Sequence, residues 1–221
     1  MTMIDSAPVT ALLDRLFAED ENARPLIASE FAHITDEERR RLMGSKTEYR
    51  SFYGHLKDAP LAVSRDTGLL LYMLARAVVA DSIVEFGTSF GISTIYLAAA
   101  LRDNGGGRLI TCEFEPEKIA RAQAHLTEAG LASLVEFRAG DALETLRSDL
   151  PETIDLLLLD GAKALYRDIL HLVEPRLRPG ALIIADNADY CPEYLEHVRG
   201  GGQPYLSVPF GPDVELTMRL D

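Results

Sequence analysis

Short apolar runs alternate with amphipathic segments along most of the chain after residue 80. The runs are rich in leucine and β-branched residues and are bounded by glycine, proline or aspartate, which is typical of buried strands. They cover residues 83–86, 108–113, 133–137, 154–159 and 181–185. Apolar positions at helical spacing fill the intervals, so the pattern predicts an α/β fold with a doubly wound, mostly parallel sheet. Two further short runs, 205–208 and 214–219, extend the expected sheet to seven strands.

The first part of the chain lacks this alternation and is predicted to be helical. A stripe of apolar residues within 12–17 indicates one amphipathic helix, and Thr35 with the acidic residues after it is a typical start of another. We therefore expect an N-terminal helical extension over residues 1–56, which contacts substrate or a partner subunit. The α/β domain is expected over residues 57–221.

A cluster of basic residues falls on the second predicted helix. Residues 39–41 are three consecutive arginines, and Lys46, Arg50 and Lys57 follow them. Two interpretations stay open. The cluster is either a solvated helix face paired with the glutamates just before it, which we favour, or a patch that receives an anionic substrate tail.

The composition is that of one folded domain with an acidic surface. The chain has 221 residues, of which 47% are hydrophobic, and a net charge of −13, most of it after residue 80. It has no basic footprint for nucleic acid, so a nucleic-acid partner is not expected. The acidic excess fits a cationic cofactor or a metal ion, and it equally fits a surface that keeps the protein in solution.

Cysteine usage and hydropathy predict a cytoplasmic protein without membrane contact. The two cysteines, Cys112 and Cys191, form no C-x-x-C pair and no disulfide framework. The longest apolar run, residues 69–80, is interrupted by Arg76 and is too short to cross a bilayer. The first residues lack the basic start and apolar core of a secretion signal.

A glycine turn joins the first predicted strand to the helix after it. Glu85 is followed by Gly87 and Gly91, which permit a tight turn with positive φ and leave space at the helix start. The spacing differs from the G-x-G-x-x-G loop that cradles a pyrophosphate. A carboxylate beside the loop would repel an anion, whereas it suits the amino group of S-adenosylmethionine (SAM). SAM is therefore the expected ligand; another nucleotide or a decayed site is the alternative.

Each of the five predicted parallel strands ends at or near an acid. Because the carboxyl ends of parallel strands meet at one edge of the sheet, these acids are expected to surround a ligand site. They are Glu85, Glu113, Asp141, Asp160 and Asp186. Glu113 is expected to accept hydrogen bonds from the ribose hydroxyls of a cofactor. Asp141 would lie beside the adenine, although capping of the following helix explains it equally well.

The most informative group combines Asp160 with Asp186 and Asn187. The two aspartates end adjacent predicted strands, and the asparagine adds a neutral oxygen. Three oxygen donors select a hard divalent cation, with Mg²⁺ expected and Mn²⁺ or Ca²⁺ as alternatives. Lys163 follows Asp160 by three residues, and a nearby cation would lower its pKa, which makes it a candidate general base. The alternative is an aspartate cap followed by a lysine in the first helical turn.

The chain resembles the cation-dependent O-methyltransferases of the catechol and caffeoyl-CoA type, in particular their small bacterial relatives. The motifs that carry the resemblance are residues 85–93, Glu113, Asp160-x-x-Lys163-x-x-Tyr166 and Asp186-Asn187, within a similarity over roughly residues 60–220. The resemblance implies a Rossmann-like class I methyltransferase fold, a homodimer, Lys163 as the base, and a cation held by Asp160, Asp186 and Asn187. It also implies SAM contacts from Val63, Glu85, Gly87, Thr88, Ser93, Glu113, Asp141 and Asp160.

Two features depart from the family pattern. The chain has no tryptophan, which leaves the aromatic wall around a catechol unaccounted for. The final loop, residues 210–215, differs from both named branches, and either Asp213 or Glu215 is expected to anchor a substrate hydroxyl.

The expected activity is transfer of a methyl group from SAM to a hydroxyl of a small-molecule acceptor with two vicinal oxygens. Three alternatives stay open. They are a metal-independent SAM methyltransferase, an RNA methyltransferase acting on a hydroxylated nucleotide, and a SAM-binding protein without catalysis.

Overall fold

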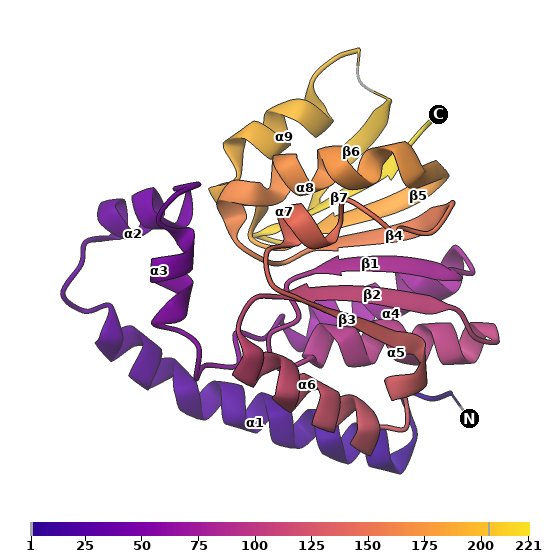
Figure 1. The fold of residues 1–221 in the computed structure, drawn as a ribbon, viewed down its shortest axis with the longest axis horizontal. Coiled ribbons are helices and arrows are strands. Elements are labelled where there is room, and N and C mark those ends of the chain that lie inside the picture. The colour runs from indigo at the N-terminus through magenta and orange to yellow at the C-terminus, as the bar shows by residue number, and fades with distance from the viewer. Residues whose placement is uncertain (1, 203) are drawn as a thin grey trace.

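The computed structural model of the protein describes residues 2–202 and 204–221, and these form a seven-stranded sheet flanked by helices (Figure 1). The strand order is β3-β2-β1-β4-β5-β7-β6. The strands are β1 (Ser82–Phe86), β2 (Arg108–Glu113), β3 (Val135–Ala139), β4 (Ile154–Leu159), β5 (Leu177–Ala185), β6 (Tyr205–Phe210) and β7 (Val214–Arg219). Strands β1 to β5 run parallel, and β7 is antiparallel to both of its neighbours. The predicted doubly wound, mostly parallel sheet is confirmed.

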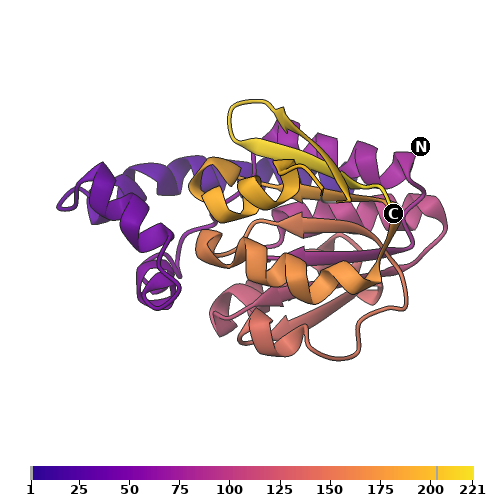
Figure 2. The same cartoon turned by 90° about the horizontal axis from the view of Figure 1, so that it is seen from above.

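Helices cover both faces of the sheet. They are α1 (Ala7–Glu30), α2 (Asp36–Met43), α3 (Tyr49–Gly54), α4 (Arg65–Ala77), α5 (Ile92–Asn104), α6 (Pro116–Glu128), α7 (Ala142–Thr145), α8 (Tyr166–Val173) and α9 (Pro192–Arg199). One core joins the sheet to α1, α4, α5 and α6, and a second joins it to α7, α8 and α9. Figure 2 shows the same layers from above.

Strand β1 lies inside this sandwich, which explains its composition. Successive side chains point to opposite faces, so Ile83 enters one core while Val84 and Phe86 enter the other. Both faces are covered, and all five residues of β1 are buried. The one carboxylate in this strand, Glu85, therefore needs internal partners.

The N-terminal helices divide their packing between the sheet and a separate cluster. Apolar residues from the first half of α1 belong to the core beneath α4 and α5. Beyond it, Phe31 packs with Phe52, Leu56 and Ala59 in a small cluster of its own. Helices α2 and α3 stand beside one end of the sheet (Figure 1). The division into an extension over residues 1–56 and a domain over 57–221 stays a prediction.

Two predicted elements differ from the observed ones. The helix predicted in the interval between the third and fourth strands is limited to the single turn of α7. The strand predicted over residues 181–185 begins earlier, at Leu177, and passes through Pro179 and Gly180, where Gly180 has φ +80° and the register with β4 shifts. A glycine with positive φ is typical of a bulge, which lets the strand continue through an apparent turn sequence.

Within residues 2–202 and 204–221, no helix has the length and apolar character needed to traverse a bilayer. Cys112 and Cys191 are both buried free thiols.

Candidate active site

A cavity of about 760 Å³ opens at the carboxyl edge of the sheet, under the N-terminal helices. Its volume lies within the range of about 300–1,000 Å³ that ligand pockets usually have. Most of the predicted site residues line it. They are Val63, Gly87, Glu113, Asp141, Asp160, Lys163, Asp186 and Asn187. Glu85, Thr88 and Ser93 are not part of the lining, although their elements border the cavity.

Gly87 begins the loop after β1 and has a φ of +105°. A Cβ atom there would lie 2.6 Å from the backbone carbonyl of Asp160. The glycine therefore lets the loop after β1 pack directly against the end of β4. Gly91 has φ +86°, and its Cβ would meet the side chains of Ala122 and Leu126 at 3.1 Å. The space at Gly91 thus serves packing against α6, whereas the sequence suggested space for a ligand.

Glu85 is fully buried beneath this loop and is held by three hydroxyl groups. Ser93, Thr94 and Thr111 donate to its carboxylate over distances of 2.6–2.7 Å. Burial raises the pKa of Glu85 to about 7 although the three hydrogen bonds favour the charged form. In this structure the carboxylate organises the loop from below, and the predicted direct contact of Glu85 with a SAM amino group stays a prediction.

Glu113 at the end of β2 reaches the cavity with a fixed orientation. Its carboxylate accepts backbone N–H bonds from Ser89, Phe114 and Glu115 at 2.8–3.1 Å. These contacts link the loops after β1 and β2 and fix the orientation of the carboxylate. The contact of Glu113 with ribose hydroxyls stays a prediction.

Asp141 caps the helix that follows it and also lines the cavity. Its carboxylate accepts the backbone N–H of Leu143 at 2.9 Å. Arg50 on α3 forms an ion pair with the same carboxylate. The carboxylate of Asp141 therefore links α3 to the loop after β3 through this ion pair. A contact with the adenine, as expected, would use the same carboxylate.

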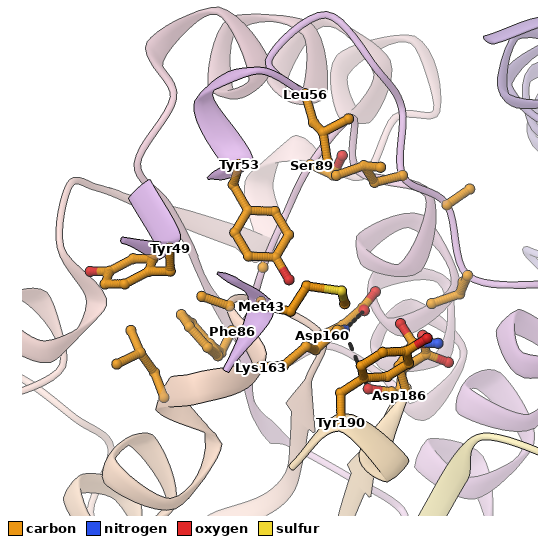
Figure 3. A pocket seen from close by; sticks show the side chains of 18 of the residues that line it. Met43, Tyr49, Tyr53, Leu56, Phe86, Ser89, Asp160, Lys163, Asp186 and Tyr190 are labelled. Atoms are coloured by element: carbon orange, nitrogen blue, oxygen red, sulfur yellow. Dashed lines mark hydrogen bonds and ion pairs between the residues drawn. The ribbon is translucent and has the colours of Figure 1, made fainter. Parts of the chain in front are cut away.

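Lys163 sits in a buried polar group at the ends of β4 and β5 (Figure 3). Its Nζ donates to Asp160 Oδ1 at 3.1 Å and to Tyr166 Oη at 2.8 Å, and it lies 3.3 Å from the carbonyl oxygen of Asp186. Tyr166 in turn donates to that carbonyl at 2.8 Å. The spacing of three residues predicted from the sequence therefore brings the lysine back over the aspartate.

The charges in this group depend strongly on one another. Burial raises the pKa of Asp186 to about 7, and the nearby carboxylate of Asp160 adds to the effect. Burial disfavours the Lys163 ammonium, but the attraction of Asp160, followed by Tyr53 and Asp186, outweighs it and raises the pKa of Lys163. The lowered pKa expected for this lysine depends on a bound cation and stays a prediction.

Asn187 completes the set of oxygen donors. It adopts the left-handed conformation, with φ +52°, which asparagine tolerates better than most residues. Its Nδ2 donates to Asp213 Oδ2 at 3.4 Å, so Oδ1 is the atom left for the cavity. Two buried carboxylates with one amide oxygen fit a hard divalent cation. No group of three or more His, Cys, Asp or Glu with metal-binding geometry occurs within the described chain.

Asp213 and Glu215 differ in their access to the cavity. Asp213 lines the cavity beside Asn187. Glu215 points elsewhere: it is 1% exposed, pairs with Arg199 at 2.5 Å and accepts a hydrogen bond from Ser207. Glu215 therefore cannot anchor a substrate hydroxyl, because its carboxylate is already occupied within the hairpin of β6 and β7.

Several lining residues were missed by sequence reasoning. Lys118 on α6 is only 4% exposed, and its Nζ lies 3.3 Å from Ser89 Oγ, beside the part of the cavity that the loop after β1 lines. Tyr53 on α3 enters from the opposite side, with its ring above Lys163 (Figure 3). No motif in the sequence identifies these two residues. A lysine on an amphipathic helix looks like a surface residue, and a tyrosine in a helix of unknown role looks like a core residue.

The comparisons with known proteins agree with this geometry. Residues 84–188 match a family described as a methyltransferase domain. The chain is 39% identical to a catechol O-methyltransferase of Niastella koreensis over 130 residues, which are 58% of each protein. It is 34% identical to a catechol O-methyltransferase of Mycobacterium tuberculosis over 142 residues, covering 64% of this chain and 60% of that one. The alignments thus span about three fifths of these relatives.

Solved structures extend the likeness over more of the chain. The O-methyltransferase TomG of Streptomyces achromogenes, involved in tomaymycin synthesis and solved with SAM, is 28% identical with a TM-score of 0.64. The match covers 85% of this chain and all of that one. An O-methyltransferase of Bacillus cereus, solved with S-adenosylhomocysteine (SAH), shares the fold at 21% identity and a TM-score of 0.65, over 93% and 100% of the two chains.

Residues 84–188 thus resemble a methyltransferase domain, and the seven-stranded sheet has the fold of class I methyltransferases. The predicted resemblance to O-methyltransferases of the catechol and caffeoyl-CoA type is confirmed.

Proposed function

We propose that this protein transfers a methyl group from SAM to a hydroxyl of a small-molecule acceptor that carries two vicinal oxygens. Asp160, Asp186 and Asn187 would hold a divalent cation, with Mg²⁺ as the first choice. The likeness to catechol O-methyltransferases supports the reaction, and the donor set at the ends of β4 and β5 supports the cation.

The cofactor would occupy the half of the cavity formed by the loops after β1, β2 and β3. Glu113 would accept the ribose hydroxyls, because its carboxylate is already oriented by three backbone N–H groups. Asp141 would lie beside the adenine, and Val63 and Gly87 would border the amino-acid tail. These assignments place the methyl group toward Lys163.

The acceptor would bind between this half and the N-terminal helices. A cation bound by Asp160, Asp186 and Asn187 would lower the pKa of the acceptor hydroxyl as a Lewis acid. With its pKa lowered by the bound cation, Lys163 would be a neutral amine and would take the hydroxyl proton at Nζ, which Tyr166 and Asp160 hold in place. The buried surroundings would exclude water and align the acceptor oxygen with the methyl group.

The observation that carries the proposal is the convergence of Asp160, Lys163, Asp186 and Asn187 on one cavity wall. The test is titration calorimetry on metal-stripped protein, with SAM first and a catechol second, with and without Mg²⁺. SAM is expected to bind alone, and the catechol only with Mg²⁺. The variant Asp186→Asn should lose the Mg²⁺ effect, whereas Asp189→Asn, at an exposed position, should keep it. Catechol binding and turnover that ignore Mg²⁺ would instead support a metal-independent methyltransferase.

We also propose a homodimer in the cytoplasm. The resemblance to the O-methyltransferase family supports the dimer, and the acidic chain with two buried free cysteines is consistent with a reducing compartment. Light scattering would measure the dimer directly.

A further inference from the structure

The part of the cavity that is lined by the N-terminal helices carries none of the proposed catalytic or metal-binding residues. We call it the roof chamber, and it is formed by α1, α2, α3 and the segment that follows them. Its walls are mostly apolar, with side chains from Ile27, Phe31, Met43, Phe52, Leu56 and Leu61. A diol bound at Asp160 and Asp186 would place the rest of its molecule here. The acceptor therefore has room for an apolar or aromatic body beyond its reacting ring.

The charges that line the roof chamber are of one sign. Among the described residues of α1 to α3, the cavity lining includes Arg24 and Arg39 and no carboxylate. The acids of the lining come from the carboxyl edge of the sheet, from the loops that follow its strands, and from Asp66 in the first turn of α4. An acceptor that spans the cavity would meet a cation site at one end and arginine at the other.

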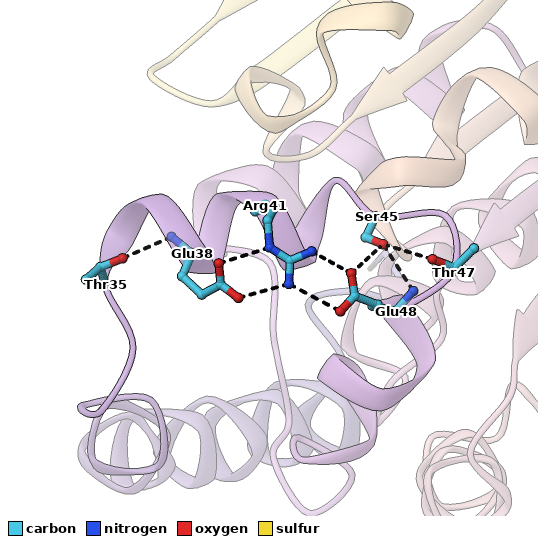
Figure 4. Close-up of polar contacts among 6 residues, drawn as sticks. All are labelled: Thr35, Glu38, Arg41, Ser45, Thr47 and Glu48. Atoms are coloured by element: carbon cyan, nitrogen blue, oxygen red, sulfur yellow. Dashed lines mark hydrogen bonds and ion pairs between the residues drawn. The ribbon is translucent and has the colours of Figure 1, made fainter.

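Arg39 differs from its two neighbours in the arginine run. Arg41 forms ion pairs with Glu38 at 2.9 Å and Glu48 at 2.5 Å (Figure 4). Arg40 lies over the ring of Tyr190, 5.4 Å from its centre. Arg39 Nε is buried in the cavity wall without a hydrogen-bond partner in the described structure. A buried guanidinium N–H without a partner is costly, and a bound anion would satisfy it.

Among the described residues, Tyr53 supplies a second buried polar group without a hydrogen-bond partner in the lining of this cavity. Its Oη is buried, has no hydrogen-bond partner within the described residues, and faces the region of Asp160 and Lys163 (Figure 3). A phenol in this position can donate to an acceptor oxygen. Apart from Arg39 and Tyr53, the buried polar side-chain atoms found without partners belong to Arg76 and Ser82, which do not line this cavity.

We infer that the acceptor is an aromatic vicinal diol with an acidic side chain, whose carboxylate binds Arg39 while Tyr53 hydrogen-bonds the diol end. This inference rests on the proposed function and narrows its substrate class. It also divides the arginine cluster of the sequence: the run is largely a paired surface face, and one member of it receives an anion.

The test compares a catechol with a propenoate side chain with the primary amide of the same molecule. The protein is expected to prefer the acid by about tenfold or more in kcat/KM, because a charged hydrogen bond is lost in the amide. Arg39→Gln should abolish this preference, and Arg39→Lys should restore part of it. Arg41→Gln, on the same helix, should leave the preference unchanged because Arg41 is already paired.

Equal rates for acid and amide in the unmodified protein, or an unchanged preference in Arg39→Gln, would overturn the inference. Calorimetric titration measures the binding of the acid and the amide without turnover, so it distinguishes a failure of this inference from a failure of the proposed function. Acid-selective binding that depends on Arg39, without any methylation, would overturn the reaction and keep the inference. Methylation without acid preference would do the reverse.

Tyr53→Phe tests the second contact. The variant should raise KM several-fold for acid and amide alike, since it acts on the end that both compounds share. An unchanged KM for both compounds would remove Tyr53 from the binding site. A thermal melt of each variant checks that the N-terminal helices stay folded.

Discussion

Tyr166 connects the candidate base to the backbone of Asp186: its Oη accepts a hydrogen bond from Lys163 and donates one to the Asp186 carbonyl, both at 2.8 Å. The ring of Tyr166 is buried against Phe86 and Tyr194. The amine of Lys163 is therefore positioned by a packed side chain and by the main chain directly after β5. The flexible side chain of Lys163 is thus held at its end by these contacts.

The first prediction concerns these two residues. Lys163→Ala should lower kcat by about 10²–10⁴ if the amine removes the proton. Tyr166→Phe should cost less, because the amine remains and only its position is loosened. Single-turnover kinetics with saturating SAM measure both effects. A loss below about tenfold in Lys163→Ala would assign Lys163 to positioning and require another base.

The second prediction concerns Lys118. Burial lowers the pKa of Lys118, and the Ser89 hydroxyl is the one hydrogen-bond partner of its Nζ among the described residues. A carboxylate on the amino-acid tail of SAM would provide a charged partner. Lys118→Met should therefore weaken SAM and SAH binding by about 10- to 100-fold, the range expected when a charged hydrogen bond is lost.

Methylthioadenosine provides the ligand control, since it lacks the amino-acid tail. Its affinity should stay the same in Lys118→Met, and the exposed Lys57→Met should change neither ligand. Equal weakening of SAM and methylthioadenosine would point to a general distortion of α6.

The third prediction concerns pH and Glu85. Its pKa is raised by burial from 4.5 to about 7, so the folded state holds a proton that the unfolded state releases. Its contribution to stability is complete below about pH 4.5 and is lost as the pH rises through 7, by about 3 kcal/mol in all. Glu85→Gln cannot titrate, so the difference in unfolding free energy between the two proteins should change across this window. A constant difference from pH 4.5 to 8 would contradict the raised pKa.

The fourth prediction uses two glycines of similar conformation. Gly87 and Gly105 have φ of +105° and +112°, but a Cβ atom on Gly87 would lie 2.6 Å from backbone atoms, whereas one on Gly105 would meet nothing within 4 Å. Gly105→Ala should cost about 1–2 kcal/mol for the left-handed conformation. Gly87→Ala should cost about 1–3 kcal/mol more and weaken the Mg²⁺-dependent binding of a catechol, because it pushes on Asp160. Chemical denaturation and calorimetry measure the two effects, and equal costs would rule out the contact.

The sheet and its acidic edge were predictable because each is encoded locally. Ile154 to Leu159 is largely apolar since both faces of β4 are covered, and an acid directly after it has only one edge to occupy. The same reasoning placed Asp160 and Asp186 together. It gives no guidance on which of these acids is exposed: Glu85 does not line the cavity, and three hydroxyl groups enclose its carboxylate.

The roof was not predictable in this way. Tyr53 and Arg39 belong to no recognisable motif, and they reach the cavity because Phe31, Phe52 and Leu56 cluster and fold the N-terminal helices over it. Contacts between distant segments of this kind leave no periodic pattern in the sequence. The arginine cluster could be interpreted in two ways because the fold determines which carboxylates, such as Glu48, lie close enough to pair with it.

The separation between roof and sheet has a consequence for how this protein can diversify. The proposed chemistry lies on residues 85–187, whereas the roof chamber is lined by residues 24–61. The roof is joined to the sheet partly by surface ion pairs such as Lys46 with Asp168 at 2.7 Å and Arg50 with Asp141. Such pairs contribute little stability and tolerate replacement. Exchange of the N-terminal helices between homologues should therefore transplant acceptor preference as a module, while the methyl-transfer machinery is inherited intact.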